Sequence, residues 1–385
     1  MDYKSDIVYR RHLRNWKILQ SLISIPVVRK FNMTHEDIDV EGPILLIPNH
    51  VSSWDPLLVS ESLRHKQVYY VASEHLFRKG FLSKVLRWLV DPIPRSKGNA
   101  GMDTVRICLR HLRAGHSVCI FAEGEQSWDG RNGKVYPATG KLAKLSGATL
   151  VTYRIEGGYL SKPRWADTVR KGRVHGHPAG IYPPELLRTM SPEEIADIIN
   201  RDISENAWER QKESPCEYRG KRLAEGLERV LYLCPSCKKT GTLTSHEDRL
   251  TCSCGLNVRY RTDGFFEPDT PFSDIAEWED WQKQAIRNGD FVHGEQLFSD
   301  DGIDLIKISD HQETPIGRGR LVQYEDRLTL SGTSYSLSDI DSMAMTRTHI
   351  LLFSSGGEYY QLSSKPGVNF RKYLELWKKH AGISN

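Results

Sequence analysis

The sequence of 385 residues predicts an α/β domain, a mixed sheet flanked by helices, followed by a small cysteine-containing module and a β-rich C-terminal domain. Short apolar runs alternate with helix-like stretches over the first half of the chain. Four cysteines cluster beyond it, and closely spaced strand patterns with turn signals fill the last third. The expected divisions are a basic segment at 1–30, the α/β domain at 31–215, the cysteine module at 230–265, a helical linker at 272–290 and the β-rich domain at 300–385.

The first 30 residues are the most basic part of the chain. They hold seven Lys and Arg against two Asp, a net +5, whereas the whole chain has a net charge of +4. Apolar residues recur at helical spacing: Leu13, Trp16, Leu19, Leu22 and Ile23. A basic amphipathic helix with Trp is typical of segments that bind a membrane interface, and a helix that covers the α/β domain is the alternative. The apolar stretch 18–28 is too short to span a bilayer, and no cleavable signal peptide is evident.

A His and an Asp follow the first apolar run of the α/β domain. The run 43–48 is bounded by prolines and predicts a buried strand, so His50 falls just past a strand's carboxyl end, where open α/β sheets place their sites. Asp55-Pro56 predicts a helix start with Asp55 as N-cap. A His with a carboxylate partner can take a proton from an alcohol, so His50 and Asp55 are candidate catalytic residues. The alternative is a loop histidine beside a helix cap.

Further polar residues follow strand-like runs downstream. Arg95 comes after a helical stretch at 82–89, Glu123-Gly124 follows the apolar run 118–122, and Arg154 follows a third strand at 149–153. In an open α/β sheet the carboxyl ends of the strands lie at one edge, so side chains that follow several strands can form one site. The alternatives are a solvated surface arginine at position 95 and a strand-end salt bridge at Glu123.

Together these motifs resemble the glycerolipid acyltransferases of the lysophosphatidic acid acyltransferase type, over residues 20–215. The His-x4-Asp of the first block is His50 and Asp55, and the second block ends at Arg95. The segment that begins Phe121-Ala122-Glu123-Gly124 resembles the third block, which in the family is usually Phe-Pro-Glu-Gly-Thr-Arg-Ser. Four segments carry the resemblance in the family's order: 49–55, 93–95, 121–130 and 151–153.

The resemblance implies an O-acyltransferase of phospholipid synthesis. It would move a fatty acyl group from acyl-CoA or acyl-carrier protein to a hydroxyl of a lysophospholipid, with 1-acyl-glycerol-3-phosphate as the expected acceptor. His50 would act as general base and Asp55 would hold its tautomer. Arg95 would bind an anionic head group, Glu123 and Gly124 would shape the acceptor site, and Arg154 would contribute to substrate binding. A peripheral location on the inner, cytoplasmic face of the membrane is expected.

The chain departs from the family's third and fourth blocks. Ala122 replaces a proline, Glu125 stands where Thr is usual, Gln126 stands where Arg is usual, and the segment 151–153 lacks its central proline. A glutamine cannot supply the fixed positive charge that suits a phosphate. Two alternatives therefore stay open: an acyltransferase of a different lipid acceptor, and an acyltransferase-fold binding or scaffold protein without this activity.

Four of the seven cysteines form a Cys-x2-Cys and a Cys-x-Cys pair, separated by fourteen residues: Cys234, Cys237, Cys252 and Cys254. Paired cysteines around a hairpin are typical of zinc ribbons, and four thiolates would leave no open position on the metal. We therefore expect a structural Zn²⁺, with disulfides as the alternative. Charges around this module are mixed and no aromatic-and-basic platform stands out, so no nucleic acid is expected as a partner.

The last third combines a helix-like segment at 274–287 with two hairpin signatures. These are 319–330, turning at Glu325-Asp326, and 350–362. An amphipathic helix containing Phe370, Tyr373 and Trp377 ends the chain. Hairpins closed by one C-terminal helix resemble a pleckstrin-homology or GRAM-like module.

Overall fold

The structure, a computed structural model, describes residues 6–63, 66–73, 77, 81–95, 101–309, 312–365 and 368–383. The first five residues of the predicted basic segment lie outside these ranges, as do 310–311, 366–367 and 384–385 of the predicted β-rich domain. The chain divides into two compact units, Met1–Pro163 with Val169–Arg219 and Arg164–Thr168 with Gly220–Asn385. Each unit is described by itself below.

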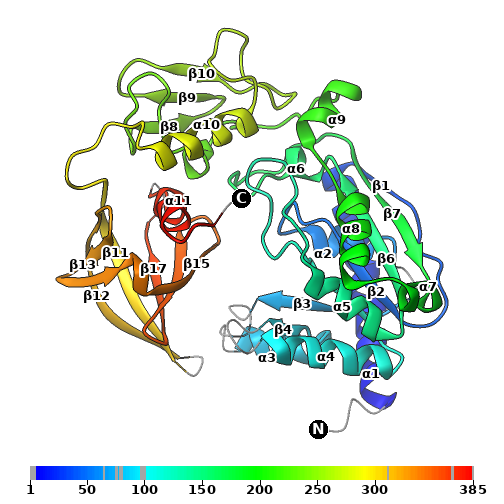
Figure 1. Cartoon of the computed structure of the whole chain (residues 1–385). Helices are drawn as coiled ribbons and strands as arrows, with labels where there is room; N and C mark the ends of the chain where they lie inside the picture. The colour runs from blue at the N-terminus through cyan, green and yellow to red at the C-terminus, as the bar shows by residue number, and fades with distance from the viewer. Residues whose placement is uncertain are drawn as a thin grey trace. The chain divides into compact units, whose positions relative to one another are not determined.

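The first unit is built on a seven-stranded mixed sheet of order β1-β7-β6-β2-β5-β3-β4 (Figure 1). The paired strands run parallel except for the antiparallel pair β6 and β7. The strands are β1 Met33–His35, β2 Ile44–Pro48, β3 Val68–Ser73, β4 Ile93–Arg95, β5 Ser117–Cys119, β6 Thr149–Glu156 and β7 Val174–Tyr182. The predicted strand at 43–48 is confirmed as β2, which lies in the middle of the sheet with all five residues buried.

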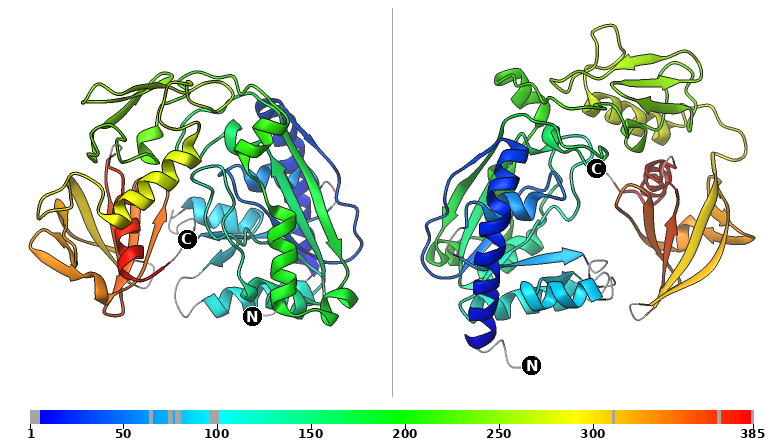
Figure 2. Two further views of the ribbon diagram at one scale, coloured as in Figure 1. Left: turned by 45° about the horizontal axis from the view of Figure 1, so that its top comes forward. Right: turned by 180° about the vertical axis from the view of Figure 1, so that it is seen from behind.

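Helices cover both faces of this sheet. They are α1 Asp6–Phe31, α2 Asp55–Ser60, α3 Phe81–Leu89, α4 Gly101–Arg113, α5 Pro137–Ser146, α6 Gly158–Ser161, α7 Pro184–Thr189, α8 Pro192–Ile203 and α9 Ala207–Glu213. The front and back views place α8 on one face and α1 on the other (Figures 1 and 2). Helices α5 and α8 approach so closely that a Cβ at Gly140 would lie 1.9 Å from the Pro192 carbonyl oxygen.

Helix α1 confirms the helical spacing predicted for the basic segment and buries Trp16, Val27 and Phe31 in the first unit. Its opposite side leaves Ile18, Leu22 and Ile25 more than half exposed. Among the residues that the structure describes, every helix is too short or too polar to cross a bilayer.

Two local predictions about this unit are wrong. Asp55 is the first residue of α2 rather than its N-cap, which is Trp54. The Asp55 carboxylate instead turns back and accepts the backbone N–H groups of Val51 and Ser52. The third predicted strand does not end before Arg154, because antiparallel pairing with β7 continues to Glu156.

The second unit contains two antiparallel sheets. The small one has the order β10-β9-β8, and the larger one has the order β14-β13-β12-β11-β17-β16-β15. Its elements are η3 Leu227–Arg229, β8 Leu243–His246, β9 Arg249–Cys252, β10 Asn257–Arg259, α10 Ile275–Asn288, β11 Phe298–Ser309, β12 Gln312–Gln323, β13 Arg327–Leu330, β14 Thr333–Ser336, η4 Leu337–Asp339, β15 Ile340–Thr346, β16 Ile350–Ser355, β17 Glu358–Ser363 and α11 Arg371–His380. The predicted hairpins are confirmed as β12/β13 and β16/β17, and the predicted helices as α10 and α11.

Candidate active site

The end of β2 is fixed to β6 by the side chain of Asn49. This residue is fully buried, and its amide nitrogen donates to the Ile155 carbonyl at 3.0 Å while its amide oxygen accepts the Ile155 N–H at 2.7 Å. The Asn49 N–H itself donates to the Tyr153 carbonyl. The side chain therefore prolongs the β2–β6 pairing past Pro48, where a backbone ladder would otherwise stop. His50 is the next residue, so its starting point is rigidly set.

His50 and Asp55 are hydrogen bonded through their side chains. Nδ1 of His50 lies 2.7 Å from Oδ2 of Asp55, and the same carboxylate oxygen accepts the N–H groups of Val51 at 2.7 Å and Ser52 at 2.9 Å. Because an ionised carboxylate is an acceptor only, this contact places the His50 proton on Nδ1 and leaves Nε2 with a lone pair. The Phe121 ring stacks on the imidazole at a centroid distance of 4.3 Å.

The surroundings of Asp55 oppose its charge. Its side chain is fully buried, and burial raises its pKa, while the hydrogen bond and charge of His50 work in the opposite direction. A proton arriving on the His50 ring would make the pair an imidazolium and a carboxylate in contact. The buried Asp55 is therefore placed to stabilise a positive charge that develops on His50.

Glu123 lies on the other side of His50 and holds its backbone. The Glu123 carboxylate accepts the His50 N–H at 2.7 Å, the Asn132 side-chain amide at 2.9 Å and the Gly133 N–H at 2.6 Å. Burial raises the pKa of Glu123 to about 7, against the effect of these three donors. These three contacts are not the salt bridge given above as the alternative for Glu123, because all three donors are uncharged amides.

Gly124 and Arg95 are in direct contact. Nη1 of Arg95 donates to the Gly124 carbonyl at 2.8 Å, and a Cβ at Gly124 would lie 3.1 Å from Nη2. Gly124 also has a φ of +79°, which a residue with a side chain rarely adopts. The positive φ therefore favours glycine here, and a larger residue would also displace the end of the Arg95 side chain. The exposed Arg95 side chain lies on this glycine, beside the loop that follows Glu123.

Arg154 and Glu125 have identifiable partners. The Arg154 guanidinium donates to the carbonyl of Asp202 in α8, from Nε at 2.9 Å and from Nη2 at 2.6 Å. The Glu125 carboxylate accepts the indole N–H of Trp128 at 3.0 Å. The structure thus brings His50, Asp55, Glu123, Gly124 and Arg95 into one chain of contacts, whereas the hydrogen bonds described for Arg154 run to α8.

Sequence reasoning missed three residues that support this site. Asn132 bonds to Glu123, Ser127 donates its N–H to the His50 carbonyl at 2.9 Å, and Asn49 extends β2. Asn49 and Ser127 belong to recognised segments, but Asn132 lies in the turn-rich stretch 129–133, whose composition indicates a loop and nothing more.

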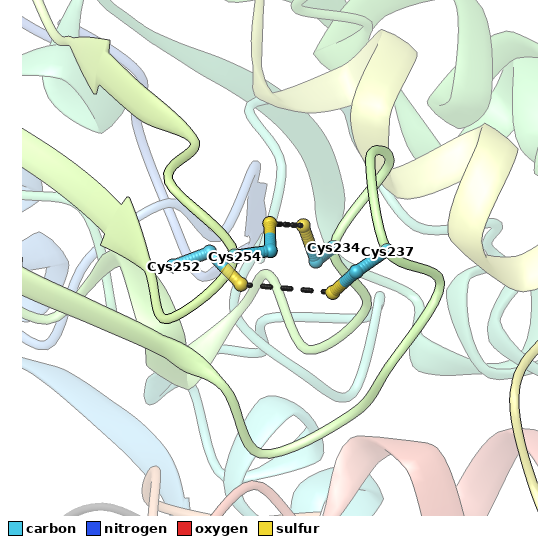
Figure 3. Close-up of side chains that lie close together, drawn as sticks. All are labelled: Cys234, Cys237, Cys252 and Cys254. Atoms are coloured by element: carbon cyan, nitrogen blue, oxygen red, sulfur yellow. Dashed lines mark hydrogen bonds between the residues drawn. The ribbon is translucent and has the colours of Figure 1, made fainter.

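The four clustered cysteines face one another in the second unit (Figure 3). Sγ of Cys234 lies 3.7 Å from that of Cys254, and Sγ of Cys237 lies 3.8 Å from that of Cys252. All four sulfur atoms are within 4.8 Å of one another. These separations exceed a disulfide bond, and they fit a tetrahedron around a metal, since Zn–S bonds of about 2.3 Å place sulfurs about 3.8 Å apart. The residues present therefore suit a four-thiolate metal site.

The fold and the site define a mixed α/β domain with a His–Asp pair at the carboxyl end of a central strand. Residues 30–156 match the model of the family described as Acyltransferase, in agreement with the resemblance that the motifs carry. Among solved structures, the 1-acyl-sn-glycerophosphate (LPA) acyltransferase PlsC from Thermotoga maritima is similar at 16% sequence identity and a TM-score of 0.36, over 51% of this chain and 95% of that chain.

Proposed function

We propose that the protein is an O-acyltransferase that moves a fatty acyl group from acyl-CoA or acyl-carrier protein to a hydroxyl of a lysophospholipid, with 1-acyl-glycerol-3-phosphate as acceptor. The observation that carries this proposal is the 2.7 Å contact between His50 Nδ1 and Asp55 at the end of β2, inside the region that matches the acyltransferase family. Such a pair can remove a proton from an alcohol, which is the step that acyl transfer to a hydroxyl requires.

In the proposed reaction, Nε2 of His50 takes the proton of the acceptor hydroxyl as its oxygen attacks the thioester carbonyl. Asp55 accepts the Nδ1–H and stabilises the imidazolium. A new C–O ester bond forms, the C–S bond breaks, and the departing thiolate takes the proton from His50. The base is then restored with no covalent enzyme intermediate.

The proposed acceptor site lies next to His50. Arg95 is exposed beside Gly124 and would bind an anionic head group through the N–H groups that do not hold the Gly124 carbonyl. Glu123 and Gly124 would shape the wall of this site. Arg154 remains a proposed substrate-binding residue, although its described hydrogen bonds would have to be shared with or exchanged for those of a substrate.

The experiment is product analysis by lipid mass spectrometry with palmitoyl-CoA and a panel of lysolipids. We expect CoA release that depends on acceptor, with phosphatidate formed from 1-acyl-glycerol-3-phosphate. Transfer to another lysolipid alone would favour the alternative acceptor that Glu125 and Gln126 motivate. Acceptor-independent hydrolysis, or no reaction with either acyl-CoA or acyl-carrier protein, would contradict the proposal and favour a binding or scaffold protein.

We also propose that the protein binds the cytoplasmic face of a membrane through α1. Ile18, Leu22 and Ile25 are 54%, 68% and 59% exposed and lie at i, i+4 and i+7, one stripe of the helix. Basic residues on the same helix would attract anionic lipids. An apolar stripe flanked by basic side chains is the form that interfacial helices take.

Replacing Leu22 with glutamate tests this proposal. In the proposed complex Leu22 is buried in the membrane, and burial of a leucine side chain is worth about 1.5–3 kcal/mol. We therefore expect the affinity for phosphatidylglycerol-containing vesicles, measured by co-sedimentation, to fall about tenfold or more. Leu186→Glu is the matched control, because Leu186 is 44% exposed on α7. Equal vesicle binding by wild type and Leu22→Glu would contradict a role of the stripe.

In the second unit we propose a structural Zn²⁺ held by Cys234, Cys237, Cys252 and Cys254, on the sulfur geometry described above. We further propose that β11–β17 and α11 form a pleckstrin-homology or GRAM-like module, because seven antiparallel strands precede one C-terminal helix. An experimental structure tests the second proposal: a seven-stranded sheet bent so that β11–β14 cross β15–β17, with α11 over the open end, would support it, and a flat sheet would contradict it.

A further inference from the structure

His50 is held at two separate points by two carboxylates. Asp55 holds the ring through Nδ1, whereas Glu123 holds the backbone through the His50 N–H at 2.7 Å. The direction in which Nε2 points depends on both, because a ring fixed at one atom can still move with its backbone. The position of the Glu123 carboxylate is therefore part of the geometry of the base.

The Glu123 carboxylate is itself positioned by the loop 129–133. Oε1 accepts both the His50 N–H and the Asn132 side-chain amide, and Oε2 accepts the Gly133 N–H. Every one of these partners is a donor, so the arrangement suits the ionised carboxylate, which is an acceptor only. A glutamine or a protonated Glu123 would place a hydrogen-bond donor opposite one of the three N–H groups, and that hydrogen bond would be lost.

Asn132 connects this carboxylate to the start of α9. Its amide nitrogen lies 2.9 Å from Glu123 Oε1, while its amide oxygen accepts the N–H of the buried Glu205. The loop is fixed on the same side by the Trp208 indole, which donates to the Asp129 carbonyl at 2.7 Å. The amide of Asn132 thus has each end engaged, and its nitrogen cannot rotate away from Glu123 without losing the contact with Glu205.

We propose that Asn132 is a positioning residue for acyl transfer: it acts through Glu123 to fix the backbone of His50 and hence the direction of its reactive Nε2. The inference rests on the proposed function for its chemistry and on the three contacts above for its geometry. Asn132 lies outside the segments that carry the family resemblance. Among ionisable residues, Asp55 acts on Glu123 through its charge and His50 through its backbone N–H.

Three variants test this role. Asn132→Ala removes both contacts of the amide. Asn132→Asp keeps an acceptor for the Glu205 N–H and loses the donor to Glu123. Asn200→Ala is the matched control, because Asn200 is also partly buried and makes a comparable pair of hydrogen bonds. They join it to the backbone of Val135, two residues past the loop, at 2.8 and 2.9 Å.

Activity with palmitoyl-CoA and 1-acyl-glycerol-3-phosphate should distinguish these variants. We expect kcat to fall about 10–100-fold in both Asn132 variants with KM within about threefold, since misplacement of a catalytic group by a fraction of an ångström costs rate rather than binding. Loss of a donor to the ionised carboxylate raises the pKa of Glu123 above about 7, so the rising limb of the pH–rate profile should move to higher pH. Asn200→Ala should keep the wild-type profile.

A measurement that needs no substrate separates failure of this inference from failure of the proposed function. The His50 imidazole is followed by NMR in protein carrying ¹³C-labelled histidine, assigned with His50→Ala. We expect the ring chemical shifts of His50 to move in both Asn132 variants and not in Asn200→Ala, even if no acceptor is found, because the ring follows its backbone. Unchanged His50 ring chemical shifts in the Asn132 variants, or a loss of kcat in Asn200→Ala equal to theirs, would overturn the proposal.

Discussion

Replacing His50 with alanine is expected to lower kcat for acyl transfer about 10³-fold while the protein stays folded. General base catalysis contributes roughly 10²–10⁴ to such reactions, and the Nε2 of His50 is the group that the geometry offers for it. The ring is partly exposed and rests on Phe121, so its removal leaves a small gap at the surface of the core. The measurements are steady-state kinetics and the thermal unfolding midpoint of each variant.

His177→Ala is the matched control for this prediction. His177 is also partly exposed, lies in the same unit and contacts a carboxylate, with Nε2 3.2 Å from Glu156. We expect its loss to leave kcat close to wild type. Asp55→Asn adds a second test, because an amide would set a donor or a weaker acceptor against Nδ1 of His50, and kcat should fall about 10²–10⁴-fold. Wild-type turnover in His50→Ala would refute the assignment of the base.

Local sequence signals predicted the elements that carry the site. The strand β2 could be recognised because a short apolar run between prolines predicts a buried strand, and His50 follows this run closely. The hairpins β12/β13 and β16/β17 could be recognised because their strands are neighbours in the chain and their turns have characteristic residues. Within the site, the contact between His50 and Asp55 spans five positions, and the strand end before His50 together with the helix start at Asp55-Pro56 suggested it.

The supporting contacts could not be predicted because their partners are distant in the chain. Asn49 meets Ile155 across 106 positions, and Glu123 meets His50 across 73. Such pairs depend on the order of strands in the sheet, which no local pattern encodes. The same cause explains why Arg154 continues β6: its strand is prolonged by pairing with β7, whose position in the sheet the sequence does not reveal. Asp55 differs from the predicted N-cap because the helix already includes it, and its Oδ2 accepts three donors that lie upstream.

Loss of the four-thiolate site is expected to have the largest effect on stability. Structural zinc contributes roughly 10–16 kcal/mol to the folding of small zinc modules, and a metal here would join the segment 234–237, before β8, to the end of β9. The effect should extend beyond the cysteines. Trp278 of α10 donates to the Leu233 carbonyl at 3.0 Å, and Gln282 donates to the Val230 carbonyl at 2.9 Å, just before Cys234.

We therefore expect about one zinc per chain by elemental analysis of wild-type protein, and none in Cys234→Ser or Cys252→Ser. A chelator or either substitution should lower the unfolding midpoint of the second unit by about 10 °C or more, since each kcal/mol is worth roughly 2–4 °C in a unit of this size. Cys216→Ser is the control, because Cys216 lies outside the cluster and in the first unit. Metal-free wild-type protein with an unfolding midpoint unmoved by added zinc would show that the thiols pack without a metal, and the stability of the small sheet would then have to come from the contacts of α10.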